Sequence, residues 1–411
     1  KLYKKYMQSS WPTKKLGEIC KKIKAGGTPS RKTSKYWNGE IPFVKIEDLT
    51  ASGFYLEKTK EKITQQGLKN SNAWLLPPNS VLFSIYATIG EVSINKISVA
   101  TNQAILGIIP NNEIVDFKFL AYLLKKFGKY LISYNVQSTQ KNLTLEVVKN
   151  LQIPLPPLLI QQKIVKILDT IQEAVDIQEK IIEKTKELKK SLMNLLFHYG
   201  VAGLRVKELA SLQVGKLKSE ELEKLGLKLK KTEIGEIPEH WDVVRLGEGY
   251  EITTKPLNFE MKKFELIPFV PMEEIGFGTA NPKYYMKKME EISSGVYFEK
   301  GDLLLAKITP SFENGKQSIV ENIPLNFGIA TTEVIPIKQS SKSSIYYLFY
   351  YLQKEDVRNN LAEKMEGTTG RKRLSKNVLL AFPIPLPPLS EQQKIAEILQ
   401  TIDQKIEIER R

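Results

Sequence analysis

The chain has 411 residues, of which 42% are hydrophobic, and its 61 Lys and Arg residues exceed its 46 Asp and Glu residues to give a formal net charge of +15. This length predicts two or three domains rather than one core, and the composition excludes a largely disordered chain. The basic excess favours a polyanionic partner, nucleic acid before a membrane surface, and no apolar run approaches the ~20 residues that a membrane span needs.

The chain contains the same pattern twice, with an offset of about 230 residues. Trp11 is echoed by Trp241, and the run Ile-Pro-Leu-Pro-Pro-Leu occurs at residues 153–158 and again at 384–389. We call these two runs the proline segments. A repeat of this strength predicts two tandem units, each a globular part followed by a helix.

Each globular part is predicted to combine short strands with a helix. The strands are expected where apolar runs of four to six residues are bounded by turn residues. These elements predict an α+β fold with two similar globular α/β domains. The strands are predicted at 81–86 and 104–109 in the first unit and at 303–308 and 334–337 in the second, and the helices at 117–127 and 344–353.

A long helix is predicted after each proline segment, because proline cannot occupy a helix interior. From there apolar residues recur at steps of three and four over more than five heptads, which indicates a coiled-coil seam. The alternative is an ordinary core helix, but such helices average ~12 residues. The predicted seam residues are Ile164, Ile167, Ile171, Ile181, Leu188, Leu192 and Leu195 in the first helix and Ile395, Ile398 and Ile402 in the second.

The order of these parts predicts the architecture. If the two helices pack as an antiparallel coiled coil, the globular domains are related by a pseudo-twofold axis. Because the domains differ in most residues, they would read different sequences in a split, asymmetric DNA site. The predicted boundaries are 1–157 for the first domain, 158–204 for its helix, 205–231 for a charged connector, 232–386 for the second domain and 387–411 for a second helix, whose pattern is cut short as in a truncated copy.

Polar and basic loops occur at corresponding places in the two units and are the predicted DNA contacts. Phosphate contacts need Lys, Arg and small polar groups, and base reading needs Arg, Lys, Asn or Gln. Gly367 and Gly370 would also let backbone N–H groups approach a phosphate, and the alternative is a solvated surface turn. The candidates are Thr28, Ser30, Arg31, Lys32, Lys35, Tyr36, Gln137, Ser138, Thr139, Gln140, Lys141, Thr253, Lys255, Thr368, Thr369, Arg371, Lys372 and Arg373.

The motifs of a self-contained enzyme or a metal site are weak or missing. Asn-Pro-Lys-Tyr at 281–284 departs at its third residue from the Asn-Pro-Pro-Tyr of amino-methyltransferases, and the chain has no Walker-type phosphate loop. His198 and His240 make no convincing zinc site with Cys20. We therefore predict no catalytic residue, metal or cofactor in this chain. The single cysteine excludes an internal disulfide and fits the cytoplasm.

Several stretches form a recognisable set: Gly-Gly-Thr-Pro-Ser at 26–30, Ala-Thr-Asn-Gln at 100–103, both proline segments, Glu-Gln-Gln-Lys-Ile at 391–395 and the run at 232–241. They resemble the specificity (S) subunit of a type I restriction–modification system, and the resemblance covers essentially the whole chain. It implies a non-catalytic subunit with two target-recognition domains, each reading one half of a bipartite site in double-stranded DNA. The helices would set the spacer and dock two methyltransferase (M) subunits, and restriction (R) subunits would join through that complex. S-adenosylmethionine, ATP and Mg²⁺ are then implied for the partner subunits.

Two other functions stay open at this stage. A self-sufficient DNA-modifying enzyme would need the motifs that the chain lacks. A coiled-coil or membrane-surface scaffold would bind DNA without sequence preference and would leave the paired polar loops without a role. The corresponding loops therefore favour a DNA reader.

Overall fold

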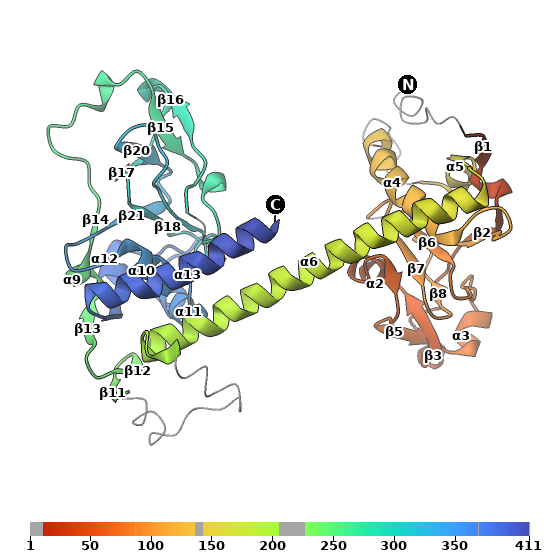
Figure 1. Cartoon of the computed structure of the whole chain (residues 1–411), viewed down its shortest axis with the longest axis horizontal. Helices are drawn as coiled ribbons and strands as arrows, with labels where there is room; N and C mark the ends of the chain where they lie inside the picture. The colour runs from red at the N-terminus through yellow and green to blue at the C-terminus, as the bar shows by residue number, and fades with distance from the viewer. Residues whose placement is uncertain are drawn as a thin grey trace. The chain divides into compact units, whose positions relative to one another are not determined.

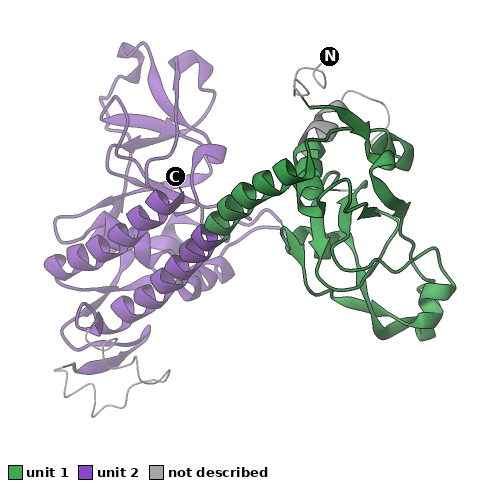
Figure 2. Cartoon of the chain, turned by 45° about the vertical axis from the view of Figure 1, so that its right-hand side comes forward, with its two compact units in different colours: residues 1–176 green, residues 177–411 purple. Residues whose placement is uncertain are grey.

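The computed structural model describes residues 11–86, 88–135, 143–204, 227–278, 280–368 and 370–410. It divides the chain into two compact units, unit 1 (Lys1–Asp176) and unit 2 (Ile177–Arg411), shown in Figure 2. Both units combine helices and sheets, in agreement with the predicted α+β class. The division lies within the first long helix rather than at its predicted start, and most of the predicted connector, 205–231, lies outside the described residues.

Unit 1 contains a five-stranded sheet in the order β2-β9-β6-β7-β4, a three-stranded sheet β5-β3-β8 and the pair β1-β10. Every residue of β6 and β7 is buried, and α4 packs against both strands (Figure 1). A run buried on both faces explains why β6 is apolar without alternation. The bounds are β1 Thr13–Lys15, β2 Cys20–Ala25, β3 Trp37–Val44, α2 Ile46–Ala51, β4 Tyr55–Leu56, β5 Glu61–Ile63, α3 Gln65–Lys69, β6 Val81–Ser84, β7 Val92–Asn95, β8 Ala100–Thr101, β9 Ile105–Pro110, α4 Phe117–Asn135, α5 Leu145–Lys149, β10 Gln152–Pro154 and α6 Leu158–Tyr199, which continues into unit 2.

Unit 2 contains two four-stranded sheets, β14-β21-β18-β19 and β16-β15-β20-β17, and the pairs β11-β12 and β13-β22. Its largest core joins the β18 and β21 side chains to α10, α13 and the end of α6. The bounds are β11 Leu229–Thr232, β12 Gly235–Pro238, β13 Asp242–Arg245, α9 Leu246–Gly249, β14 Tyr250–Ile252, β15 Ile267–Val270, β16 Tyr285–Lys287, β17 Val296–Glu299, β18 Leu303–Ala306, β19 Gln317–Ile319, β20 Phe327–Ala330, β21 Val334–Gln339, α10 Ile345–Tyr351, α11 Glu355–Glu363, α12 Lys376–Leu380, β22 Pro383–Leu386 and α13 Leu389–Arg410.

The predicted repeat is present in the strand pairing. The first residues of each proline segment belong to the last strand of their unit. This strand pairs antiparallel with the strand that follows the repeated tryptophan, Trp11 or Trp241. Lys14 lies opposite Ile153 in β1-β10, and Val244 lies opposite Ile384 in β13-β22. Because these pairs occupy the same places in the repeated sequence, both units close in the same register.

A buried glutamine ties α6 to the globular part of unit 1. Gln161 donates from Nε2 to the carbonyl oxygens of Pro156 at 2.9 Å and Ile114 at 3.1 Å. Its Oε1 accepts the N–H of Asp116 at 2.9 Å. Both N–H groups of this amide and its oxygen are thus hydrogen-bonded inside the protein.

The same arrangement recurs in unit 2. Gln392 donates from Nε2 to the carbonyl oxygens of Pro387 at 2.7 Å and Lys342 at 3.2 Å, and its Oε1 accepts the N–H of Ser344 at 2.9 Å. Both glutamines are 0% exposed. The repeated Gln-Gln pair therefore has a structural role that fixes each helix to its own proline segment.

Helix α6 runs unbroken for 42 residues and α13 for 22, and each begins beside its proline segment, as predicted. Within unit 2 the two helices are antiparallel. Gln178 donates to the carbonyl oxygen of Glu409 at 2.8 Å, and Lys189 donates to Asp403 at 2.8 Å. Figure 2 shows α13 beside the unit 2 part of α6.

The predicted seam residues are buried in only part of the helix pair. Leu192 and Ile395 are buried, and Leu195, Ile398 and Ile402 are partly buried against hydrophobic clusters of unit 2, whereas Ile164 packs on the unit 1 core. The prediction is wrong for four residues that are more than one third exposed: Ile167 (62%), Ile171 (55%), Ile181 (39%) and Leu188 (38%).

These four exposures have a geometric cause. The first two lie before Gln178, where the described part of α13 no longer accompanies α6. Ile181 and Leu188 lie beside the face of α6 that contacts α13. That face carries Gln178 and Lys189. Within the described part of the chain, no helix has both the length and the apolar character that crossing a membrane would need.

Candidate nucleic-acid interface

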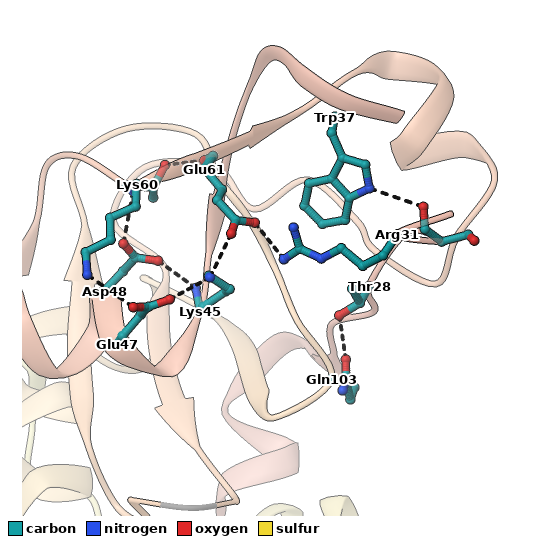
Figure 3. Close-up of polar contacts among 11 residues, drawn as sticks. Thr28, Arg31, Trp37, Lys45, Glu47, Asp48, Lys60, Glu61 and Gln103 are labelled. Carbon is teal, nitrogen blue, oxygen red and sulfur yellow. Dashed lines mark hydrogen bonds and ion pairs between the residues drawn. The ribbon is translucent and has the colours of Figure 1, made fainter. Parts of the chain in front are cut away.

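In unit 1 the predicted loop starts at Gly26 and Gly27, whose backbone packs against Thr101 of β8. Gly27 donates its N–H to the carbonyl oxygen of Thr101 at 2.9 Å. A Cβ on Gly26 would overlap the same carbonyl oxygen, so only glycine fits there. Thr28 then donates its hydroxyl to Oε1 of Gln103 at 2.6 Å (Figure 3). The start of the loop is thereby fixed to the end of β8.

The guanidinium group of Arg31 is held from two sides. It lies over the ring of Trp37, 3.6 Å from the centroid, and its Nη2 donates to Oε2 of Glu61 at 2.7 Å (Figure 3). The indole N–H of Trp37 donates to the carbonyl oxygen of Ser30 at 3.2 Å, which fixes the ring. Although burial raises the pKa of Glu61, hydrogen bonds from Lys45 and Arg31 hold the pKa of this carboxyl below its ordinary value. The positively charged Arg31 is therefore held in one orientation by Trp37 and by the negatively charged Glu61.

The structure brings the predicted contacts of this loop together on one exposed segment, residues 28–36, which we call the unit 1 loop. The ammonium group of Lys35 lies 6.0 Å from the centroid of the Tyr36 ring. An exposed surface of this composition suits a phosphate backbone. The exposed members are Thr28, Ser30, Arg31, Lys32 and Lys35, and Tyr36 is half-buried.

In unit 2 the predicted contacts lie on a short turn, residues 366–373, which we call the unit 2 turn. Its two ends are joined because Glu366 donates its N–H to the carbonyl oxygen of Arg373 at 3.0 Å and accepts the N–H of Arg373 at 2.8 Å. Across its tip, Arg371 donates its N–H to the carbonyl oxygen of Thr368 at 2.9 Å. The side chains of Thr368, Arg371, Lys372 and Arg373 are all exposed.

Arg373 makes a two-point ion pair with Glu333. Nε donates to Oε2 at 3.0 Å and Nη2 donates to Oε1 at 2.8 Å. The hydrogen bonds from Arg373 lower the pKa of Glu333 from its ordinary value, against the raising effect of burial, and the charge of Lys307 lowers it further. Glu333 is therefore an anion between two cations.

Gln103 and Glu333 were not among the predicted contacts, yet each supports a predicted loop residue. They occupy matched positions, two residues after the repeated Ala-Thr pair at 100–101 and 330–331. Gln103 accepts from Thr28, and Glu333 accepts from Arg373. The repeat contained this signal, but only the structure shows what the matched side chains touch.

Other predicted contacts have different outcomes. Thr253 is wrong as a DNA contact, because its side chain is only 2% exposed and its N–H donates to the carbonyl oxygen of Pro336 at 3.0 Å, continuing the sheet edge beyond β14. Lys255 is exposed, two residues further on. The remaining predicted residues lie outside the described residues: Gln137, Ser138, Thr139, Gln140, Lys141 and Thr369.

The weak enzyme and metal motifs have structural roles. The Oδ1 of Asn281 accepts the N–H groups of Glu321 at 3.1 Å and Asn322 at 2.9 Å. His240 lies 2.9 Å from Oε2 of Glu391 on α13. Among the described residues, no cluster of three or more His, Cys, Asp or Glu side chains could hold a metal ion.

Comparison with known proteins gives consistent results. A family model described as "Type I restriction modification DNA specificity domain" matches residues 8–187 and 238–411. The type I restriction enzyme MjaVIII specificity subunit of Methanocaldococcus jannaschii is 28% identical over 414 residues, covering 98% of this chain and 88% of that protein. The EcoEI specificity subunit of Escherichia coli is 34% identical over 165 residues, covering 39% of this chain and 27% of that protein. The crystal structure of a type I S subunit from M. genitalium has a similar fold, with a TM-score of 0.55 at 15% identity over 98% of this chain and 92% of that one.

Proposed function

Because the chain belongs to the family of type I restriction–modification DNA specificity proteins, we propose that it reads a bipartite, asymmetric DNA site, with one half read by each unit. The chain is a DNA sequence-specificity subunit and has no catalytic role of its own. The observation that supports the bipartite site is the closure of both units in one register around different exposed side chains. The unit 1 loop and the unit 2 turn are the proposed contacts. Lys255 is a further candidate.

The long helices are the proposed spacer and docking surface. Helix α6 begins on one globular part and ends on the other, so its length would set the distance between the half-sites. Its exposed apolar residues, among them Ile167 and Ile171, offer an apolar surface to other helices. We propose that α6 and α13 form an antiparallel coiled coil with pseudo-twofold symmetry. Two M subunits would dock on this pair of helices.

The other components follow from this assignment. R subunits would join through the M subunits, and S-adenosylmethionine, ATP and Mg²⁺ would be bound by those partners. A solved structure with a TM-score of 0.54 to this chain, at 18% identity, concerns the assembly of a type I restriction–modification system. We propose that the complex works in the cytoplasm, where the DNA is.

The test of the bipartite site is selection of bound duplexes from a random pool by the chain together with its methyltransferase partner. We expect two short base preferences separated by a fixed run without preference. A single continuous motif would contradict the proposal, and binding without any preference would favour a scaffold. Methylation or cleavage of DNA by the purified chain alone would favour a self-sufficient enzyme.

The test of the spacer is a variant that lacks residues 170–176. This heptad lies between Asp169, which contacts unit 1 residues, and Gln178, which contacts α13. Removing seven residues shortens the helix by roughly 10 Å and rotates its ends by only ~20°, so both contacts keep their faces. We expect the spacer to shorten by about three base pairs while both half-sites persist. Altered half-sites with an unchanged spacer would contradict the spacer role.

A further inference from the structure

Arg373 is fixed at both its backbone and its side chain. Two backbone hydrogen bonds with Glu366 hold it at the root of the unit 2 turn, and its N–H and carbonyl groups are both used there. Its guanidinium is fixed by Glu333 through two further hydrogen bonds. The side chain nevertheless stays 51% exposed, so it is a rigid group that a ligand can reach.

Glu333 is bonded to one edge of the Arg373 guanidinium, and this determines which N–H groups remain for a ligand. A guanidinium has five N–H donors in one plane. Glu333 takes the edge formed by Nε and one N–H of Nη2. The adjoining edge, formed by one N–H of Nη1 and the second N–H of Nη2, is not used by the carboxylate. Two parallel donors at that spacing match the O6 and N7 acceptors that guanine presents in the major groove.

The neighbouring cations differ in this respect. Within the described part of the chain, Arg371 and Lys372 on the tip of the turn make no ion pair, although both are exposed. Phosphate binding needs charge but little orientation, whereas base reading needs a planar group held in a defined direction. An exposed ion pair adds little to folding stability. The main effect of the pair with Glu333 is therefore to fix the orientation of the Arg373 guanidinium.

We propose that Arg373 donates two hydrogen bonds to a guanine in the half-site of unit 2, and that Glu333 is the positioning residue that keeps the free edge turned outward. This inference rests on the proposed function, because it requires unit 2 to read DNA. It assigns the contact to the major groove and to one G·C pair. Arg371 and Lys372 then contact phosphates beside that pair.

The test uses the full chain with its methyltransferase partner and a panel of duplexes that differ by one base pair in the site selected by the wild type. With Arg373→Ala we expect roughly 10- to 100-fold less discrimination at one G·C pair and unchanged preferences elsewhere. Arg373→Lys should lose most of that discrimination too, because an ammonium group lacks the fork. The matched control, Arg371→Ala, should weaken all duplexes alike and lower the salt slope by about one.

Glu333→Gln tests the positioning role. Without the carboxylate we expect several-fold weaker discrimination at the same G·C pair, with thermal unfolding close to the wild type. If Arg373→Ala instead weakens every duplex equally, Arg373 is a phosphate contact and the inference fails. If Glu333→Gln reads the site as the wild type does, the positioning role fails. If the wild type itself shows no bipartite preference, the proposed function fails, which is a separate outcome.

Discussion

In unit 1 a glutamine at position 103 accepts a hydrogen bond from Thr28, whereas in unit 2 the glutamate at the matched position, Glu333, holds Arg373 through two hydrogen bonds. The two side chains follow equivalent strands, yet they support different loops. Beneath them the strand pairing of the proline segments and the buried glutamines are the same in both units. The comparison indicates that the exposed loops can change while the strand pairing and the buried glutamines, which we call the frame of each unit, stay the same. Two copies of one fold can therefore read two different half-sites.

The strongest test of the shared frame is removal of the buried glutamines. Gln161→Ala or Gln392→Ala would leave two buried carbonyl oxygens and one buried N–H without their partner. Each unsatisfied group costs about 1–3 kcal/mol, so we expect each variant to lose about 4 kcal/mol of unfolding free energy. Urea unfolding of the full chain measures this loss. Similar losses in the two variants would support one frame used twice.

The control for this prediction is the next residue in each unit. Gln162 and Gln393 are exposed, so their replacement by Ala should change the unfolding free energy by less than about 0.5 kcal/mol. If Gln161→Ala lost much more unfolding free energy than Gln392→Ala, the two units would not depend on the same contact. That result would contradict the proposal of one frame used twice.

A second difference concerns one buried carboxyl group. Asp302 precedes β18 and is 2% exposed, and Ser80 precedes the matched strand β6 and is 1% exposed. The residues before them, Asn79 and Gly301, both have positive φ, which supports the match. Ser80 donates to the carbonyl oxygen of Pro77 at 2.8 Å and has no charge to bury. Burial raises the pKa of Asp302 to about 6, although the N–H of Glu299 donates to it.

The sign of the resulting pH dependence follows from this raised pKa. Between pH 4 and pH 6 the folded chain binds more protons at Asp302 than the unfolded chain does, so stability falls as the pH rises through this range. The loss amounts to about 3 kcal/mol above pH 6. Asp302→Asn should recover up to that amount at pH 8 and nothing at pH 4, as measured by thermal unfolding.

Ser80→Ala is the matched variant for unit 1. It should shift stability by about 1 kcal/mol at both pH values, since it removes one neutral hydrogen bond. An Asp302→Asn variant that is no more stable than the wild type at pH 8 would show that Asp302 is stabilised in its charged form.

The architecture was predictable from the sequence where the repeat itself carries the information. The proline segments, the start of each long helix and the strands near 81–86 and 303–308 depend on local composition and on proline geometry. The exposure of Ile181 and Leu188 was not predictable, because it depends on how α6 is rotated against α13. Thr253 failed for a related reason: its neighbours have the composition of a loop, but its backbone continues a sheet edge.

The candidate interface shows the same division. Residue type and Gly-rich flanks were enough to indicate Arg31 and Arg373. Their carboxylate partners, Glu61 and Glu333, are 30 and 40 residues away along the chain. A single sequence gives no register between such distant segments, so the side chains that orient the arginines emerge only from the fold.

The smallest expected effect concerns how each unit holds its long helix along its length. In unit 1, Asp169 on α6 accepts from Lys118 and from the Tyr122 hydroxyl at 2.9 Å. We expect Asp169→Asn to cost about 1 kcal/mol of unfolding free energy, because it weakens charge-assisted hydrogen bonds that are partly exposed. Urea unfolding at low and high salt measures this cost, and a small salt effect is expected because the pair is partly buried.

In unit 2 a different anion, Asp403 on α13, accepts from Lys189 on α6 and from the Tyr350 hydroxyl at 2.9 Å. The side chain of Lys189 is 14% exposed and that of Lys118 is 28% exposed, so an unpaired Lys189 is the costlier of the two. We therefore expect Asp403→Asn to cost about 2 kcal/mol, more than Asp169→Asn. Lys190→Ala, which breaks the exposed pair with Glu355, should leave the unfolding free energy close to that of the wild type. A larger loss of unfolding free energy from Asp169→Asn than from Asp403→Asn would contradict this prediction. It would show that Asp169 stabilises the chain more than Asp403 does.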